Sequence, residues 1–250
     1  MSRTPKLDAN GGFAHPSDSF CLRLKDDLFG TCGCRPSFRD VDGTRTIDIP
    51  ASFSPRGLLP FVGKLASLGI AAFTVYLGFG EDPRAFWLAY LTNWNVTMSS
   101  LYLLMSLINY IFPVSGPPPG QTVVNFRVKL TWILFNISAN MGILVTIAFW
   151  TLLWDGVMDM ETIFPHGILT TFVLFDGFIL NAIPIRLRHY IEVLIPFAGA
   201  YVLWSYIHSL TKIGNPDYQD QDPQTNDDLI YPILDWDNHP KLTALIVVVL

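Results

Sequence analysis

Long runs of uncharged residues constrain this chain more than any other feature of its sequence. No Asp, Glu, Lys or Arg occurs from Phe86 to Phe112. A helix rises about 1.5 Å per residue, so roughly 20 apolar residues cross the hydrocarbon core of a bilayer. Half of the 250 residues are hydrophobic and only 15% are charged, whereas a soluble domain carries about 25% charged residues. The pattern favours an all-α, polytopic transmembrane bundle.

The distribution of apolar segments predicts five complete membrane spans and a partial sixth. The complete spans are predicted at Leu58–Phe79, Phe86–Phe112, Leu130–Trp154, Ile163–Ile183 and Tyr190–Thr211. A further apolar segment from Lys241 to Leu250 is too short to span a bilayer. We interpret it as a truncated or half-inserted sixth span. Residues 58–250 thus form the transmembrane domain, and residues 1–57 form a polar, loosely ordered tail.

Basic residues indicate the orientation of the bundle. If the N-terminus is cytosolic, the tail, the loop after the second span and the loop after the fourth span hold twelve of the 16 Lys and Arg residues. Basic residues concentrate on the cytosolic side of membrane proteins. We therefore predict a multi-pass protein with a cytosolic N-terminus, in the plasma membrane or the endoplasmic reticulum.

The polar segments outside the spans give little indication of a further function. A net charge of −5 does not suit a general nucleic-acid binder. The odd number of cysteines, Cys21, Cys32 and Cys34, does not indicate a disulfide framework, and we interpret them as cytosolic thiols. The loop Lys212–Lys241 contains seven aspartates that could bind a divalent cation, but their spacing favours a solvated acidic loop. We predict no metal site and no cofactor.

A polar stripe runs along the second predicted span. Its members recur at steps of three or four and so share one side of a helix: Thr92, Asn95, Ser99, Tyr102, Ser106 and Asn109. Lipid offers these groups no hydrogen-bond partners, so the stripe should face other helices or a wet cavity. In the structural interpretation it joins helices together. In the functional interpretation Thr92 lines a reaction site within the membrane.

The predicted topology brings Thr92 and two histidines to one depth. The second and fourth spans both enter from the outer side, which places Thr92 and His166 near their outer ends, and the fifth span ends there with His208. Ionisable residues within a membrane mark functional sites by default. A histidine can take the proton of a threonine hydroxyl that acts as a nucleophile. Alternatively, both histidines sit at the membrane surface and contact water or loops.

Several neighbours could support this pair. Three carboxylates precede His166 and could orient its ring: Asp155, Asp159 and Glu161. Asp176 lies about 15 Å deeper along the same helix, so we expect it to pair with another buried group, for which Lys64 is the candidate. Asn95 or Ser99 could bind the oxyanion of a reacting ester.

Short sequence words in a fixed order resemble a known family. They are Tyr90-Leu91-Thr92-Asn93-Trp94, Phe149-Trp150, Phe164-Pro165-His166-Gly167 with Thr170-Thr171, Tyr201-Val202-Leu203-Trp204 with His208, and Tyr231-Pro232. Together they resemble the androgen-induced and androgen-dependent membrane threonine hydrolases, and most of all the Rolling stone-like branch of that superfamily. The similarity runs from Leu58 to Leu250.

The resemblance implies a multi-pass threonine hydrolase that cleaves fatty acid esters of hydroxy fatty acids. The catalytic threonine would be Thr92 and the catalytic histidine His166, with membrane lipids and a lipid ester as partners. The Rolling stone-like branch is associated with cell fusion, so a non-enzymatic role in fusion, adhesion or scaffolding is the alternative. A transporter is less favoured because the sequence shows no inverted repeat.

Overall fold

The computed structural model describes residues 57–81, 87–113, 125–154, 156–181, 183, 189–211, 231 and 234–249. Within these ranges every regular element is helical and no strand occurs. Nearly all of the predicted polar tail, the three cysteines, Asp155 and most of the aspartate-rich loop lie outside the described residues.

Four of the five predicted complete spans are helical stretches long and apolar enough to cross a membrane. They are α3 (Leu58–Glu81); α5 (Phe126–Ala148) with η2 (Phe149–Leu153); α6 (Met160–Ile163) with η3 (Phe164–Ile168), α7 (Leu169–Leu174) and η4 (Phe175–Leu180); and η5 (Tyr190–Leu194) with α9 (Ile195–Thr211). The second stretch starts four residues before the predicted boundary and the third starts three before it. The chain is therefore a multi-pass membrane protein, and the part of it that the structure describes is all-helical.

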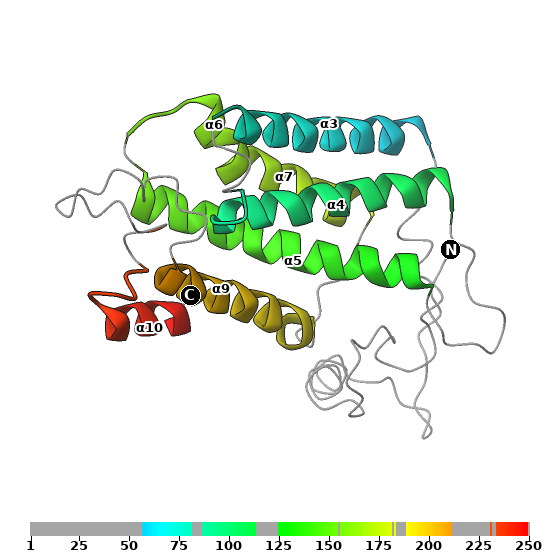
Figure 1. Cartoon of the computed structure of the whole chain (residues 1–250). Helices are drawn as coiled ribbons and strands as arrows, with labels where there is room; N and C mark the ends of the chain where they lie inside the picture. Colours follow the sequence, from blue (N-terminus) through cyan, green and yellow to red (C-terminus); the bar gives the residue numbers. More distant parts are fainter. Residues whose placement is uncertain are drawn as a thin grey trace, which may run out of the picture.

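The remaining predicted span is the polar helix α4 (Leu91–Ile111), which packs between α3 and α5 (Figure 1). It starts five residues after the predicted boundary, and its stripe of Asn and Ser side chains keeps it out of the strongly apolar class. These polar residues are buried against neighbouring helices. The predicted partial sixth span corresponds to α10 (Pro240–Val249), a helix of 10 residues beside α9 (Figure 1).

Aromatic packing joins α4 to α5 and η4 at the centre of the bundle. Tyr102 packs on Phe135 with a centroid separation of 5.2 Å, and both side chains are fully buried. Gly177 allows this arrangement, since a Cβ atom at that position would collide with the ring of Phe135. Close packing of this kind fixes how far η4 lies from α5.

The hydroxyl end of Tyr102 joins a buried group of charged and polar side chains, which we name the Lys64 cluster. It consists of Lys64, Tyr102, Ser106, Asp176 and Asn181. Lys64 donates three hydrogen bonds, to Ser106 Oγ (2.6 Å), Asp176 Oδ1 (3.0 Å) and Asn181 Oδ1 (2.7 Å). Asp176 Oδ2 accepts from Tyr102 Oη, Ser106 Oγ and Asn181 Nδ2 at 2.6–2.7 Å.

The predicted pairing of Asp176 with Lys64 is confirmed, and both side chains are fully buried. An ammonium group has three donors, and all three of the Lys64 donors are used. The cluster connects α3, α4 and η4 with no reactive atom left to meet a ligand, which is the arrangement of a structural tether.

Candidate active site

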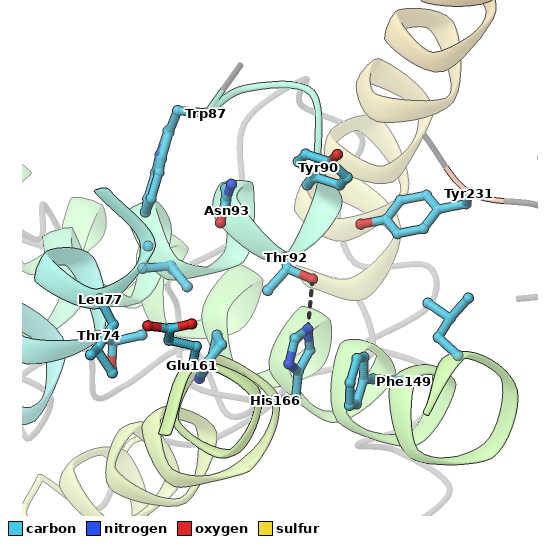
Figure 2. A pocket seen from close by; sticks show the side chains of 14 residues that line it. Thr74, Leu77, Trp87, Tyr90, Thr92, Asn93, Phe149, Glu161, His166 and Tyr231 are labelled. Carbon is cyan, nitrogen blue, oxygen red and sulfur yellow. Dashed lines mark hydrogen bonds between the residues drawn. The ribbon is translucent and has the colours of Figure 1, made fainter. Parts of the chain in front are cut away.

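Thr92 lies in the first turn of α4, which directly follows the extended residue Tyr90 that caps the helix. Tyr90 precedes the helix with φ −92° and ψ 135°, and its carbonyl accepts from the amides of Asn93 and Trp94. The hydroxyl of Thr92 therefore projects from the start of α4 rather than from its buried middle (Figure 2).

His166 is held in the π-helical segment η3. Pro165 has no amide hydrogen and cannot close the usual i→i−4 bond, which favours the wider winding observed here. The helix begins one turn earlier, where the carboxylate of Asp159 accepts from the amide of Thr162 at 2.7 Å. Hydrogen bonds with Thr162 lower the pKa of Asp159, so this cap stays ionised at neutral pH.

Thr92 and His166 form a hydrogen bond, with 3.2 Å between Oγ1 and Nε2. The other ring nitrogen, Nδ1, lies 2.8 Å from the carbonyl oxygen of Thr162. A carbonyl can only accept, so Nδ1 carries the proton, and in the neutral imidazole Nε2 then carries a lone pair. The Thr92 hydroxyl therefore donates to Nε2, which is the arrangement a general base needs to take that proton.

Two aromatic residues of η2 hold the imidazole in place. The ring of Phe149 stacks on His166 with 3.6 Å between centroids and 13° between planes. The indole Nε1 of Trp150 donates to the carbonyl of His166 at 2.9 Å. Together they limit rotation of the ring and fix the backbone that carries it.

The pair opens onto a cavity of about 300 Å³ (Figure 2). Its lining comes from α3, the start of α4, η2, α6, η3 and the segment before α10: Thr74, Leu77, Gly78, Trp87, Tyr90, Thr92, Asn93, Val96, Phe149, Leu153, Glu161, Pro165, His166 and Tyr231. Apolar walls with a few convergent polar groups are typical of small-molecule sites, and 300 Å³ lies at the lower end of their size range.

The weaker sequence candidates fall elsewhere. Asn95 and Ser99 are fully buried on α4, their side-chain polar atoms have no hydrogen-bond partner among the residues that the structure describes, and neither lines the cavity. His208 is buried on α9 with its ring 6.5 Å from that of Trp204, and it does not line the cavity either. The described residues contain no group of three or more His, Cys, Asp or Glu that could hold a metal ion.

The group that orients His166 is neither Asp159 nor Glu161, the two of the three predicted carboxylates that the structure describes. The backbone carbonyl of Thr162 takes that role. Asp159 caps the helix instead, and Glu161 lines the cavity. A backbone acceptor leaves no signal in the choice of residue type, so the sequence could not have indicated it.

Tyrosines from two other segments complete the surroundings of Thr92. The phenol of Tyr201 on α9 donates to the carbonyl of Ala89 at 3.0 Å, and the amide of Leu91 donates to the phenol oxygen of Tyr231, also at 3.0 Å. Sequence reasoning assigned no role to either. The word Tyr231-Pro232 was the only signal for the second, and it lies in a loop without periodicity.

The fold and the site define a multi-pass helical membrane protein with a hydrogen-bonded Thr–His pair beside a cavity. No family model matches the chain, and no solved structure matches it. Among curated proteins, protein rolling stone of Drosophila melanogaster is 24% identical over an alignment of 196 residues, and the match covers 72% of this chain and 66% of the relative. The chain is a distant homologue of rolling stone and spans slightly less than two thirds of its length, consistent with the Rolling stone-like resemblance.

Proposed function

We propose that this chain is a membrane lipid ester hydrolase in which Thr92 is the nucleophile and His166 the general base. The observation that carries the proposal is the hydrogen bond between Thr92 Oγ1 and His166 Nε2 at the wall of a cavity. A threonine hydroxyl is a weak nucleophile unless an adjacent base takes its proton. The backbone acceptor at Thr162 holds His166 in the tautomer that can do so.

The reaction divides into two balanced steps. In the first, Thr92 Oγ attacks the ester carbonyl while its proton passes to His166 Nε2, and collapse of the tetrahedral intermediate expels an alcohol that takes this proton back. In the second, His166 accepts a proton from water, the resulting hydroxide attacks the acyl-threonine, and the protonated imidazole returns the proton to Thr92. A fatty acid leaves and the enzyme is regenerated.

The substrate class follows from the surroundings of the pair. Leu77, Val96 and Leu153 give the cavity apolar walls suited to an acyl chain, and the apolar helices that carry the site favour a substrate that is dissolved in the membrane. We propose fatty acid esters of hydroxy fatty acids as substrates, as the family resemblance implies. With the N-terminus cytosolic, as the basic residues favour, the site lies near the exoplasmic or lumenal surface, where water for the second step is at hand.

The test is turnover of a fatty acid ester of a hydroxy fatty acid by the purified full-length chain. We expect Thr92→Ala and His166→Ala each to lower kcat by at least about 10³-fold, since the two groups act as one unit. Ser100→Ala is the matched control, because it removes a half-buried hydroxyl of the same helix that donates a hydrogen bond to the carbonyl of Val96 within that helix. A fluorophosphonate probe should label the wild type and Ser100→Ala but not Thr92→Ala.

The alternative is a non-enzymatic membrane protein for fusion, adhesion or scaffolding. The hydrogen bond between Thr92 and His166 also suits this alternative, because a link between α4 and η3 would stabilise the bundle without any chemistry. Folded wild-type protein that neither hydrolyses a panel of lipid esters nor reacts with the probe would decide for this alternative.

A further inference from the structure

Besides His166, the phenol of Tyr231 is a polar group beside Thr92 in the cavity. Tyr231 lines the same cavity as Thr92 and His166, and its phenol points toward the start of α4 (Figure 2). Its ring packs edge-on against Tyr90 with 6.0 Å between centroids and 79° between planes. The tyrosine thus reaches the reacting residues from a segment far along the chain.

The hydrogen bonds around Tyr231 determine what its hydroxyl can do. Its oxygen accepts from the amide of Leu91, the residue before the nucleophile, at 3.0 Å. A phenol has one proton, and the oxygen that accepts from an amide still has that proton to donate. The neighbouring phenol of Tyr201 donates to the carbonyl of Ala89 and does not line the cavity, whereas the phenol of Tyr231 lines it beside Thr92.

We propose that the hydroxyl of Tyr231 donates the hydrogen bond that stabilises the oxyanion formed when Thr92 attacks an ester carbonyl. The proposal rests on the proposed hydrolase function and names a further catalytic residue for it. Tyr231 lines the same cavity as Thr92 and binds the amide of Leu91, the residue before it, so an acyl carbonyl attached to Thr92 lies within reach. The carbonyl π electrons move to oxygen as the bond to Thr92 forms, and Tyr231 O–H points at that developing charge.

The surroundings also keep this donor protonated. Burial raises the pKa of Tyr231 above its ordinary value, so the phenol retains its proton at neutral pH. The role replaces the earlier suggestion that Asn95 or Ser99 binds the oxyanion, since neither of these side chains lines the cavity.

Tyr231→Phe tests the proposal, because it removes the hydroxyl and keeps the ring that packs on Tyr90. We expect kcat/KM to fall about 10²–10³-fold, the usual loss for one oxyanion donor. Affinity for a trifluoromethyl ketone analogue, which forms a tetrahedral adduct with Thr92, should fall by a similar factor. Affinity for a non-reactive ether analogue of the substrate should stay within twofold. If the Tyr231 hydroxyl had a purely structural role, Tyr231→Phe would lower the affinity for both analogues.

A control variant and a fluorinated tyrosine distinguish failure of the role of Tyr231 from failure of the hydrolase function. Tyr206→Phe is the control, since Tyr206 lies on α9 against Trp236, is 46% exposed and does not line the cavity. Where Tyr231→Phe does not fold, 3,5-difluorotyrosine at position 231 keeps the oxygen that Leu91 needs and strengthens the donor, so ketone affinity should rise. If turnover depends on Thr92 but the variants at position 231 bind the ketone as tightly as the wild type does, the role of Tyr231 is overturned and the hydrolase function stands. Absence of Thr92-dependent turnover overturns the hydrolase and this role together.

Discussion

Two polar sites share helix α4, and they differ in what surrounds their reactive atoms. In the Lys64 cluster each donor of Lys64 and both carboxylate oxygens of Asp176 have partners within the protein. Near the start of the same helix, the hydroxyl of Thr92 meets one imidazole and then an open cavity. A buried polar group whose partners are all internal can only hold the fold together. One that faces a cavity beside a base can do chemistry.

The largest expected effect on stability comes from breaking the Lys64 cluster. Lys64→Met leaves the carboxylate of Asp176 buried without its cation, and we expect a loss of about 3–5 kcal/mol of unfolding free energy. Thermal unfolding in detergent or nanodiscs measures it. The double variant Lys64→Met with Asp176→Leu should recover much of the loss, because no unpaired charge remains.

For the Thr92–His166 pair the comparison predicts a small effect on stability and a large effect on activity. Thr92→Ala should change the unfolding free energy by no more than about 1 kcal/mol, the net worth of one neutral hydrogen bond, while abolishing turnover. Equal destabilisation by Lys64→Met and Thr92→Ala would contradict the division into a tether and a reaction site.

An intermediate effect is expected from Gly177→Ala. The added methyl group would collide with the ring of Phe135, which is itself fully buried against Tyr102. Overpacking of this kind costs about 1–3 kcal/mol. Gly199→Ala is the matched control, since a Cβ atom there meets nothing within 4 Å and a helical Ala is favoured over Gly by up to about 1 kcal/mol. Opposite shifts in melting temperature are therefore expected.

The smallest effect concerns the support of His166. Trp150→Phe removes the indole donor to the His166 carbonyl, and the loss of one neutral hydrogen bond corresponds to about 0.5–1.5 kcal/mol, or roughly 3- to 10-fold in kcat. Trp154→Phe removes a similar donor, to the carbonyl of Val157, keeps an aromatic ring beside Trp150 and should leave kcat unchanged. Equal rates for the two variants would show that His166 needs no support from η2.

Periodicity and length carried the prediction of most of the fold. Apolar runs placed four spans to within a few residues, because crossing a bilayer requires helices of a given length and composition. The boundary at Phe86 was wrong: α4 begins at Leu91, and residues 87–90 form a turn. Uncharged composition alone does not distinguish a helix from the turn that precedes it.

The candidate site was predicted in part. Topology alone brought Thr92 to the depth of His166, and the observed hydrogen bond confirms that the two meet. Their catalytic roles stay predictions. Helical spacing also placed Asn95 and Ser99 on the side of Thr92, but neither residue lines the cavity. Spacing predicts which side chains share a helix face, but it does not predict which neighbouring elements that face meets.

The sequence by itself determined that this chain is a helical membrane protein with scarce polar groups in its spans, since hydrophobic length and charge are properties of each segment alone. Only the tertiary structure decided which of those groups meet. The acceptor at Thr162, the stacked ring of Phe149 and the phenol of Tyr231 come from separate segments. Their positions depend on helix packing, which no single segment specifies.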